Sequence, residues 1–106
     1  MRRTFVYSGI QNALESRTYI VPTYAETMFN AYEGARLEGS KISNRQKLAA
    51  YWLGKVEWFS DQLARTSQIE ADLEAMNIPV PTLLSEASQT LMHIVEVCQG
   101  HYELHA

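Results

Sequence analysis

The longest helical pattern in the sequence runs from Ser43 to Met76 and contains both tryptophans, Trp52 and Trp58. Apolar side chains recur in its first part at spacings of three and four residues, which place them on one face of a helix. This face is formed by Leu48, Trp52, Val56, Phe59 and Leu63. Since such a face must be buried against other elements, the pattern predicts a helix of a packed helical domain.

After Ala64 the apolar stripe moves to another face, by about a fifth of a turn at 3.6 residues per turn. The later apolar residues are Ile69, Leu73 and Met76. Ser67-Gln-Ile-Glu70 also has the spacing of a capping box, a motif that starts helices. The two observations predict a break near Thr66, with one helix over 43–65 and another over 67–77. One continuous helix that packs against two partners in succession is the alternative.

Capping boxes also mark other helix starts. Thr23-Tyr-Ala-Glu26 predicts a helix over 23–38, closed by Gly39 in the left-handed backbone conformation. Ser43-Asn-Arg-Gln46 has the same spacing and predicts the start of the helix over 43–65.

The last predicted helix follows the prolines of Asn77-Ile-Pro-Val-Pro-Thr82, which end the preceding helix because proline lacks a backbone donor. Its broad apolar face consists of Leu83, Leu84, Ala87, Leu91, Ile94, Val95 and Cys98. Gly100 is expected to stop it. We therefore predict a helix over 82–99 and an irregular tail over 100–106.

Residues 1–22 contain two β-branched and aromatic runs, Arg3–Tyr7 and Arg17–Val21, around a segment that suits a short helix. Two such runs are too few for a self-sufficient sheet. The predicted fold class is therefore mainly α. We expect one domain over 1–106, a small bundle of four to five helices with an extended or partly β N-terminal arm.

Composition excludes several function classes. The chain has 106 residues, a formal charge of −3 and a sequence pI near 5.5, so it presents no strongly basic field for nucleic acid. No apolar run approaches the roughly 18 residues of a membrane span. The single cysteine cannot form an internal disulfide, so nothing indicates an oxidising compartment. Together these observations favour a cytoplasmic protein without membrane association.

The strongest metal candidate is the set Cys98, His101 and His105, whose spacing would converge on zinc only if the last helix continued past Gly100. Since Gly100 is expected to interrupt that helix, we predict no metal and no other cofactor. The sequence also lacks a nucleophile-elbow motif. Its closely spaced carboxylates lie at alternate positions, and alternate residues do not share a face of a helix. We therefore expect no catalytic residues and no enzymatic activity.

Four basic residues surround the connection between the first two predicted helices, and they are candidate phosphate contacts: Arg36, Lys41, Arg45 and Lys47. They support an alternative function, a small nucleic-acid-associated regulator. The helix that follows is too rich in aromatic residues to read base edges, and the whole chain is acidic. A nucleic acid is therefore the less favoured partner.

An aromatic edge on the central helix is the favoured functional feature. Tyr51 and Trp58 are seven residues apart and share one side, with Lys55 and Gln62 beside them. Aromatic residues are enriched at protein interfaces, although they could instead widen the core under a neighbouring helix. These four residues are the predicted partner-binding site.

The sequence thus predicts a non-enzymatic protein–protein interaction module, such as an inhibitor or adaptor of the kind that phages and mobile elements encode. Its expected partner is another protein, and a homo-oligomer is the further assembly that we consider. Nothing in the sequence identifies that partner.

Overall fold

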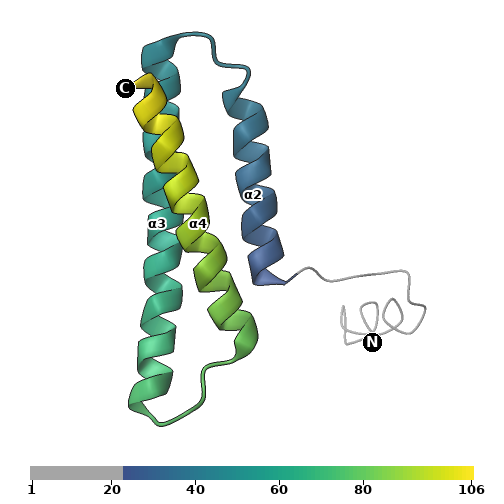
Figure 1. Ribbon diagram of the computed structural model, residues 1–106, viewed down its shortest axis with the longest axis vertical. Helices are drawn as coiled ribbons and strands as arrows, with labels where there is room; N and C mark the ends of the chain where they lie inside the picture. The colour runs from purple at the N-terminus through teal and green to yellow at the C-terminus, as the bar shows by residue number, and fades with distance from the viewer. Residues whose placement is uncertain (1–22) are drawn as a thin grey trace, which may run out of the picture.

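The computed structural model describes residues 23–106, which form three helices and no strand: α2 (Tyr24–Gly39), α3 (Arg45–Ala75) and α4 (Thr82–His105). Figure 1 shows α3 and α4 as a long antiparallel pair, with the shorter α2 beside their upper half. Helix α4 makes most of the contacts between helices, because it packs against both α3 and α2. The mainly α class is confirmed, whereas four to five helices were expected and three are present in this part of the chain. The predicted N-terminal arm, 1–22, lies outside the described residues.

Helix α2 begins as predicted. The Thr23 hydroxyl accepts a hydrogen bond from the Glu26 amide at 3.1 Å, and the Glu26 carboxylate accepts one from the Thr23 amide at 2.9 Å. The reciprocal pair satisfies two backbone donors that the first turn of a helix leaves free. It therefore fixes the residue at which α2 begins.

The conformation predicted for Gly39 is wrong, because no glycine among residues 23–106 has a positive φ. Gly39 is instead the last residue of α2 and faces Trp52. A Cβ atom at this position would lie 3.2 Å from Cζ2 of Trp52, closer than ordinary van der Waals contact. Glycine is thus needed here for close packing between helices.

The predicted break near Thr66 is also wrong, since α3 is one helix of 31 residues rather than separate helices over 43–65 and 67–77. Thr66 is buried, and its hydroxyl donates to the Leu63 carbonyl at 2.9 Å and accepts from the Ser88 hydroxyl at 3.0 Å. A polar residue can therefore stay on the buried face without ending the helix. The N-cap of α3 is Asn44, one residue beyond the predicted Ser43.

Helix α4 continues through Gly100 to His105, so the irregular tail predicted over 100–106 is replaced by more than a turn of helix. Gly100 is exposed and has ordinary helical backbone. The added turn is held by packing of the His101 ring on Trp52, and Arg45 Nε donates to the His105 carbonyl at 3.2 Å. That bond satisfies one of the carbonyls that a helix C-terminus leaves without a partner.

The core lies where all three helices meet. Its buried residues come from α2, α3 and α4, and they are Met28, Ala35, Trp52, Phe59, Leu91, Ile94 and Cys98. None of the described helices is long and apolar enough to cross a membrane.

Helix α2 covers only part of its neighbours. At 1.5 Å per residue, its 16 residues span about 24 Å, whereas the 31 residues of α3 span about 46 Å. The lower half of the α3–α4 pair in Figure 1 therefore has no third described helix beside it.

Candidate interaction surface

Tyr51, the first residue of the predicted partner-binding site, joins α3 to α2. It is partly buried, and its hydroxyl donates to the Ala35 carbonyl at 3.1 Å. Its ring meets that of Trp52 edge to face, with centroids 5.5 Å apart, while Lys55 Nζ lies 5.1 Å from the Tyr51 ring centre. Tyr51 therefore widens the core under a neighbouring helix, and Lys55 covers its ring.

Trp58, by contrast, remains on the surface with 46% of its area exposed. Its ring packs edge to face on the buried Phe59, with centroids 4.9 Å apart, so one side of the indole is held while the other faces solvent. The Gln62 side chain, one turn further along, accepts a hydrogen bond from the Tyr24 hydroxyl at 2.9 Å. This bond ties the start of α2 to the middle of α3.

Because α3 is continuous, the side that carries Trp58 extends down its length. Residues spaced by four, three and four lie along one side of a helix. We call Trp58, Gln62, Arg65 and Ile69 the α3 ridge. Ile69 is 49% exposed, so the ridge has a large apolar side chain at each end and polar ones between.

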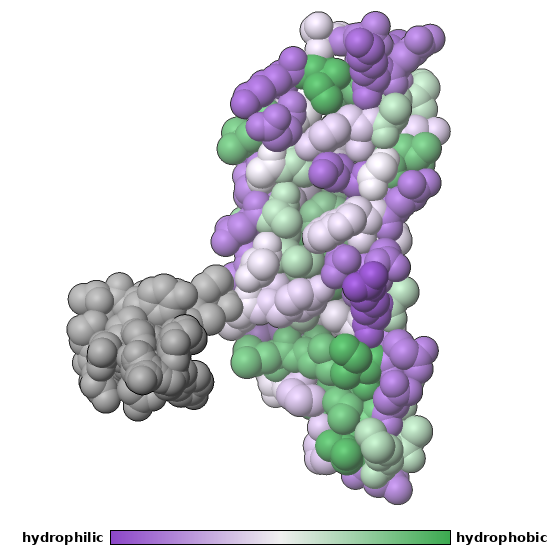
Figure 2. Space-filling model, turned by 180° about the vertical axis from the view of Figure 1, so that it is seen from behind, coloured by the Kyte–Doolittle hydropathy of each residue, from purple (hydrophilic) through white to green (hydrophobic). Residues whose placement is uncertain are grey.

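Beside the lower part of this ridge lies an open groove with a volume of about 600 Å³. It lies where α2 begins and the α3–α4 pair continues alone, and we call it the lower groove. Its lining residues are Thr23, Tyr24, Gln62, Arg65, Thr66, Ile69, Pro81, Leu83, Leu84 and Ala87. Seen from behind, apolar side chains gather over this lower half, as the green area of Figure 2 shows.

Several of these apolar side chains are unusually exposed. Leu83 is 60% exposed and Ile69 is 49% exposed, and Met76 and Ile78 near the following turn are also exposed. Contiguous apolar surface of this kind marks interaction sites more often than isolated exposed residues do. Sequence reasoning missed Leu83 and Leu84, which it assigned to the core face of α4. Leu83 is exposed and Leu84 is partly exposed because α2 begins beside the groove and does not extend over them.

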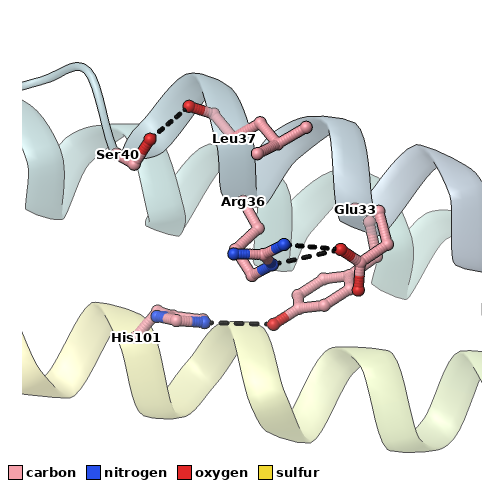
Figure 3. A network of polar contacts seen from close by, with 6 residues as sticks. Glu33, Arg36, Leu37, Ser40 and His101 are labelled. Carbon is pink, nitrogen blue, oxygen red and sulfur yellow. Dashed lines mark hydrogen bonds and ion pairs between the residues drawn. The ribbon is translucent and has the colours of Figure 1, made fainter.

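The predicted phosphate contacts do not form a free basic cluster. Arg36 pairs with Glu33 at 2.8 Å and Lys41 with Glu38 at 3.2 Å, as charged neighbours on the same turns. Arg45 donates to the His105 carbonyl, and Lys47 is exposed near the start of α3. Figure 3 shows Arg36 directed at Glu33, above the His101 side chain of α4. Two of the four basic side chains are thus paired with carboxylates of α2.

The three metal candidates do lie on a continuous helix, contrary to the predicted interruption at Gly100. Cys98 is fully buried, and burial raises the pKa of its thiol to about 11. His101 stacks on Trp52 and its Nε2 lies 3.2 Å from the Tyr32 hydroxyl. Within residues 23–106 no three His, Cys, Asp or Glu side chains are placed to hold one metal ion.

Comparison with known proteins leaves the family open: no protein-family model, curated protein or solved structure matches this chain.

Proposed function

We propose that the chain is a non-enzymatic protein–protein interaction module that binds an amphipathic helix of another protein along the α3 ridge. The observation that carries the proposal is the exposure of Trp58 and Ile69, at the two ends of the α3 ridge, beside the apolar lower groove. A helix laid in such a groove buries its own apolar face at positions spaced by three and four residues. This is the mode of binding that an inhibitor or adaptor would use.

The composition of the ridge suits an interface. Tryptophan and arginine are enriched among residues that dominate binding energy, and Trp58 and Arg65 lie seven residues apart on the same side of α3. Trp58 is also held from below by Phe59, so its ring loses little freedom on binding. Phe59 thus supports Trp58 as a preorganised contact.

Three side chains of a kind used in nucleophilic catalysis, Ser88, Cys98 and His101, take part in hydrogen bonds or packing within the described fold. The Ser88 hydroxyl donates to Thr66, Cys98 is fully buried with a raised thiol pKa, and His101 is stacked on Trp52. These arrangements favour binding over nucleophilic chemistry, which needs an activated and accessible nucleophile. The alternative nucleic-acid role has less support, because Arg36 and Lys41 are paired with carboxylates.

Site-specific photo-crosslinking in cells tests the proposal. A photoreactive phenylalanine analogue would replace Trp58 or Ile69 in separate full-length variants, with Leu37 and Leu104 as control positions. The controls are also exposed apolar residues, but they lie at the opposite end of the helices. We expect both ridge positions to crosslink to the same amphipathic segment of one protein, and the controls not to.

Equal capture of that protein at the control positions would overturn the proposal, and so would different proteins at Trp58 and Ile69. Crosslinks only between copies of this chain would replace it with self-association. The captured segment, made as a peptide, should bind the wild-type chain and lose at least tenfold in affinity for Trp58→Ala, a cost of about 1.4 kcal/mol or more.

A further inference from the structure

The lower groove is open among the described residues, yet the chain itself supplies an occupant. Residues 1–22 precede Thr23, and Thr23 and Tyr24 both line the groove. A segment attached at this point starts at the groove wall, so its effective concentration there is in the millimolar range typical of short tethers. We propose that residues 1–22 bind in the lower groove of their own chain.

The composition of this segment fits the groove. It contains the apolar runs Phe5-Val6-Tyr7 and Tyr19-Ile20-Val21, with Ile10 and Leu14 between them. The groove offers Ile69, Leu83 and Leu84, and its walls are largely apolar. Covering such side chains removes apolar area from water, which stabilises the covered state.

The charges are complementary as well. Residues 1–22 contain three arginines and one glutamate, a formal charge of +2, whereas residues 23–106 carry six basic and eleven acidic residues, a formal charge of −5. Asp61, Glu70 and Glu86 lie on the lower half of the pair outside the groove lining, and Asp61 pairs with Arg65 of the groove at 3.0 Å. Opposite charges on segment and surface favour encounter and orientation.

The geometry of α2 requires a separate segment for this role. The capping box between Thr23 and Glu26 forms the first turn of α2 beside the groove, so α2 does not extend further along α3. The uncovered length of α3 is about 22 Å by the 1.5 Å rise per residue, which corresponds to about 15 helical residues. Twenty-two residues are therefore long enough to span this length.

Such docking would give the chain a built-in competitor for its partner, and that consequence rests on the proposed function. A groove occupied in cis reduces the apparent affinity for a partner by the fraction of molecules in which the groove is free. The docking itself does not depend on any partner and can be measured in its absence.

Paramagnetic relaxation in the full-length chain tests the docking. A nitroxide would be attached at Asn12→Cys, while the buried Cys98, with its raised thiol pKa, stays unlabelled. Methyl signals of Ile69 and Leu84 should lose most of their intensity, whereas those of Leu37 and Leu104 at the far end should keep theirs. Ile69→Glu should restore the Leu84 signal, and the matched surface change Leu37→Glu should not.

A mixture of nitroxide-labelled chains with separate, isotope-labelled chains distinguishes binding of the segment to its own chain from binding to a second copy. Broadening that appears in this mixture at equal strength would mean that a second copy fills the groove, and the proposal would be wrong. Undiminished Ile69 and Leu84 signals in the singly labelled chain would also overturn it. Failure to find a crosslinked partner would contradict the proposed function and leave this measurement unaffected.

Discussion

The imidazole of His101 lies flat against the indole of Trp52, with ring centroids 4.1 Å apart and planes 12° apart. Both rings lie at the end of the bundle where α2 and α3 are joined, and the Tyr32 hydroxyl lies 3.2 Å from His101 Nε2. One stacked pair thus links α4 to α3, and a hydrogen bond between the same imidazole and the Tyr32 hydroxyl links α4 to α2.

Stability should fall in mildly acidic solution because of His101. Burial lowers its pKa below the usual 6.5, and the nearby His105 and Arg36 act in the same direction. The unfolded chain therefore takes up this proton more readily than the folded chain, so the contribution is complete above pH 6.5 and is lost as the pH falls below it. Urea denaturation at about pH 7.5 and about pH 5.5 measures the difference.

His101→Phe should make stability less dependent on pH over this interval, since phenylalanine keeps an aromatic ring on Trp52 but does not titrate. The exposed His93→Gln is the matched control and should retain the wild-type dependence. An unchanged pH profile in His101→Phe would show that another group is responsible.

Gly39→Ala should destabilise the protein, although alanine is the better helix former. The new Cβ would lie 3.2 Å from Trp52, whose ring cannot retreat because His101 is stacked on it. The expected loss is about 1–3 kcal/mol, the usual cost of overpacking. Gly34→Ala, in the same helix with open space around it, should instead stabilise by about 0.5–1 kcal/mol. Thermal denaturation of both variants compares the two effects, and stabilisation by both would contradict the packing role of Gly39.

Thr66→Val should remove the acceptor of the buried Ser88 hydroxyl and cost about 1–3 kcal/mol in unfolding free energy. Ser88→Ala removes the donor, so the double variant leaves no buried hydroxyl unpaired at this point. We expect the double variant to be more stable than the sum of the single losses predicts. Additive losses in a double-mutant cycle by urea denaturation would show that the two hydroxyls do not interact.

Tyr51→Ala should cost about 2–4 kcal/mol, since it removes a partly buried ring from the core between α3 and α2. Trp58→Ala removes a ring that is nearly half exposed and should cost no more than about 1.5 kcal/mol. Chemical denaturation gives both values. A larger loss for Trp58 than for Tyr51 would place Trp58 in the core and weaken its role in the α3 ridge.

Cys98 should resist thiol reagents in the folded protein, because it is fully buried and its pKa is raised to about 11. Labelling with an aromatic disulfide at neutral pH should become rapid only when the chain is unfolded in urea. Fast labelling of the native protein would mean that the interface between α4 and its neighbours opens readily.

Local sequence signals predicted the starts of α2, α3 and α4 to within two residues, but the helix start predicted at Ser67 and the helix end predicted at Gly100 were wrong. Thr23 and Glu26 are neighbours on one turn, so their capping interaction depends on little else. Gly100 and Ser67 carry equally clear local signals, yet packing of His101 on Trp52 and pairing of Thr66 with Ser88 override them. The apolar stripe shifts near Thr66 because α3 passes from a region beside α2 to one without it.

The lower groove could not be predicted from periodicity alone. Leu83 and Leu84 have the spacing of core residues, and the sequence alone does not show that α2 begins too far along the pair to cover them. The relative placement of three helices decides their exposure. The different positions of Trp52 and Trp58, one in the core and one at the surface, could be predicted from their angular positions, because both lie on the same helix.

The short turn between Ala75 and Thr82 has a kinetic consequence. Asn77 reverses the chain with a φ of 60°, and only six residues separate the two longest helices. Contacts near that turn join residues that are close in the sequence, and such contacts close with little loss of chain entropy. Contacts between α2 and α4, in contrast, join residues that are separated in the sequence by the whole of α3. We therefore expect the α3–α4 hairpin to be largely formed in the folding transition state and α2 to dock afterwards.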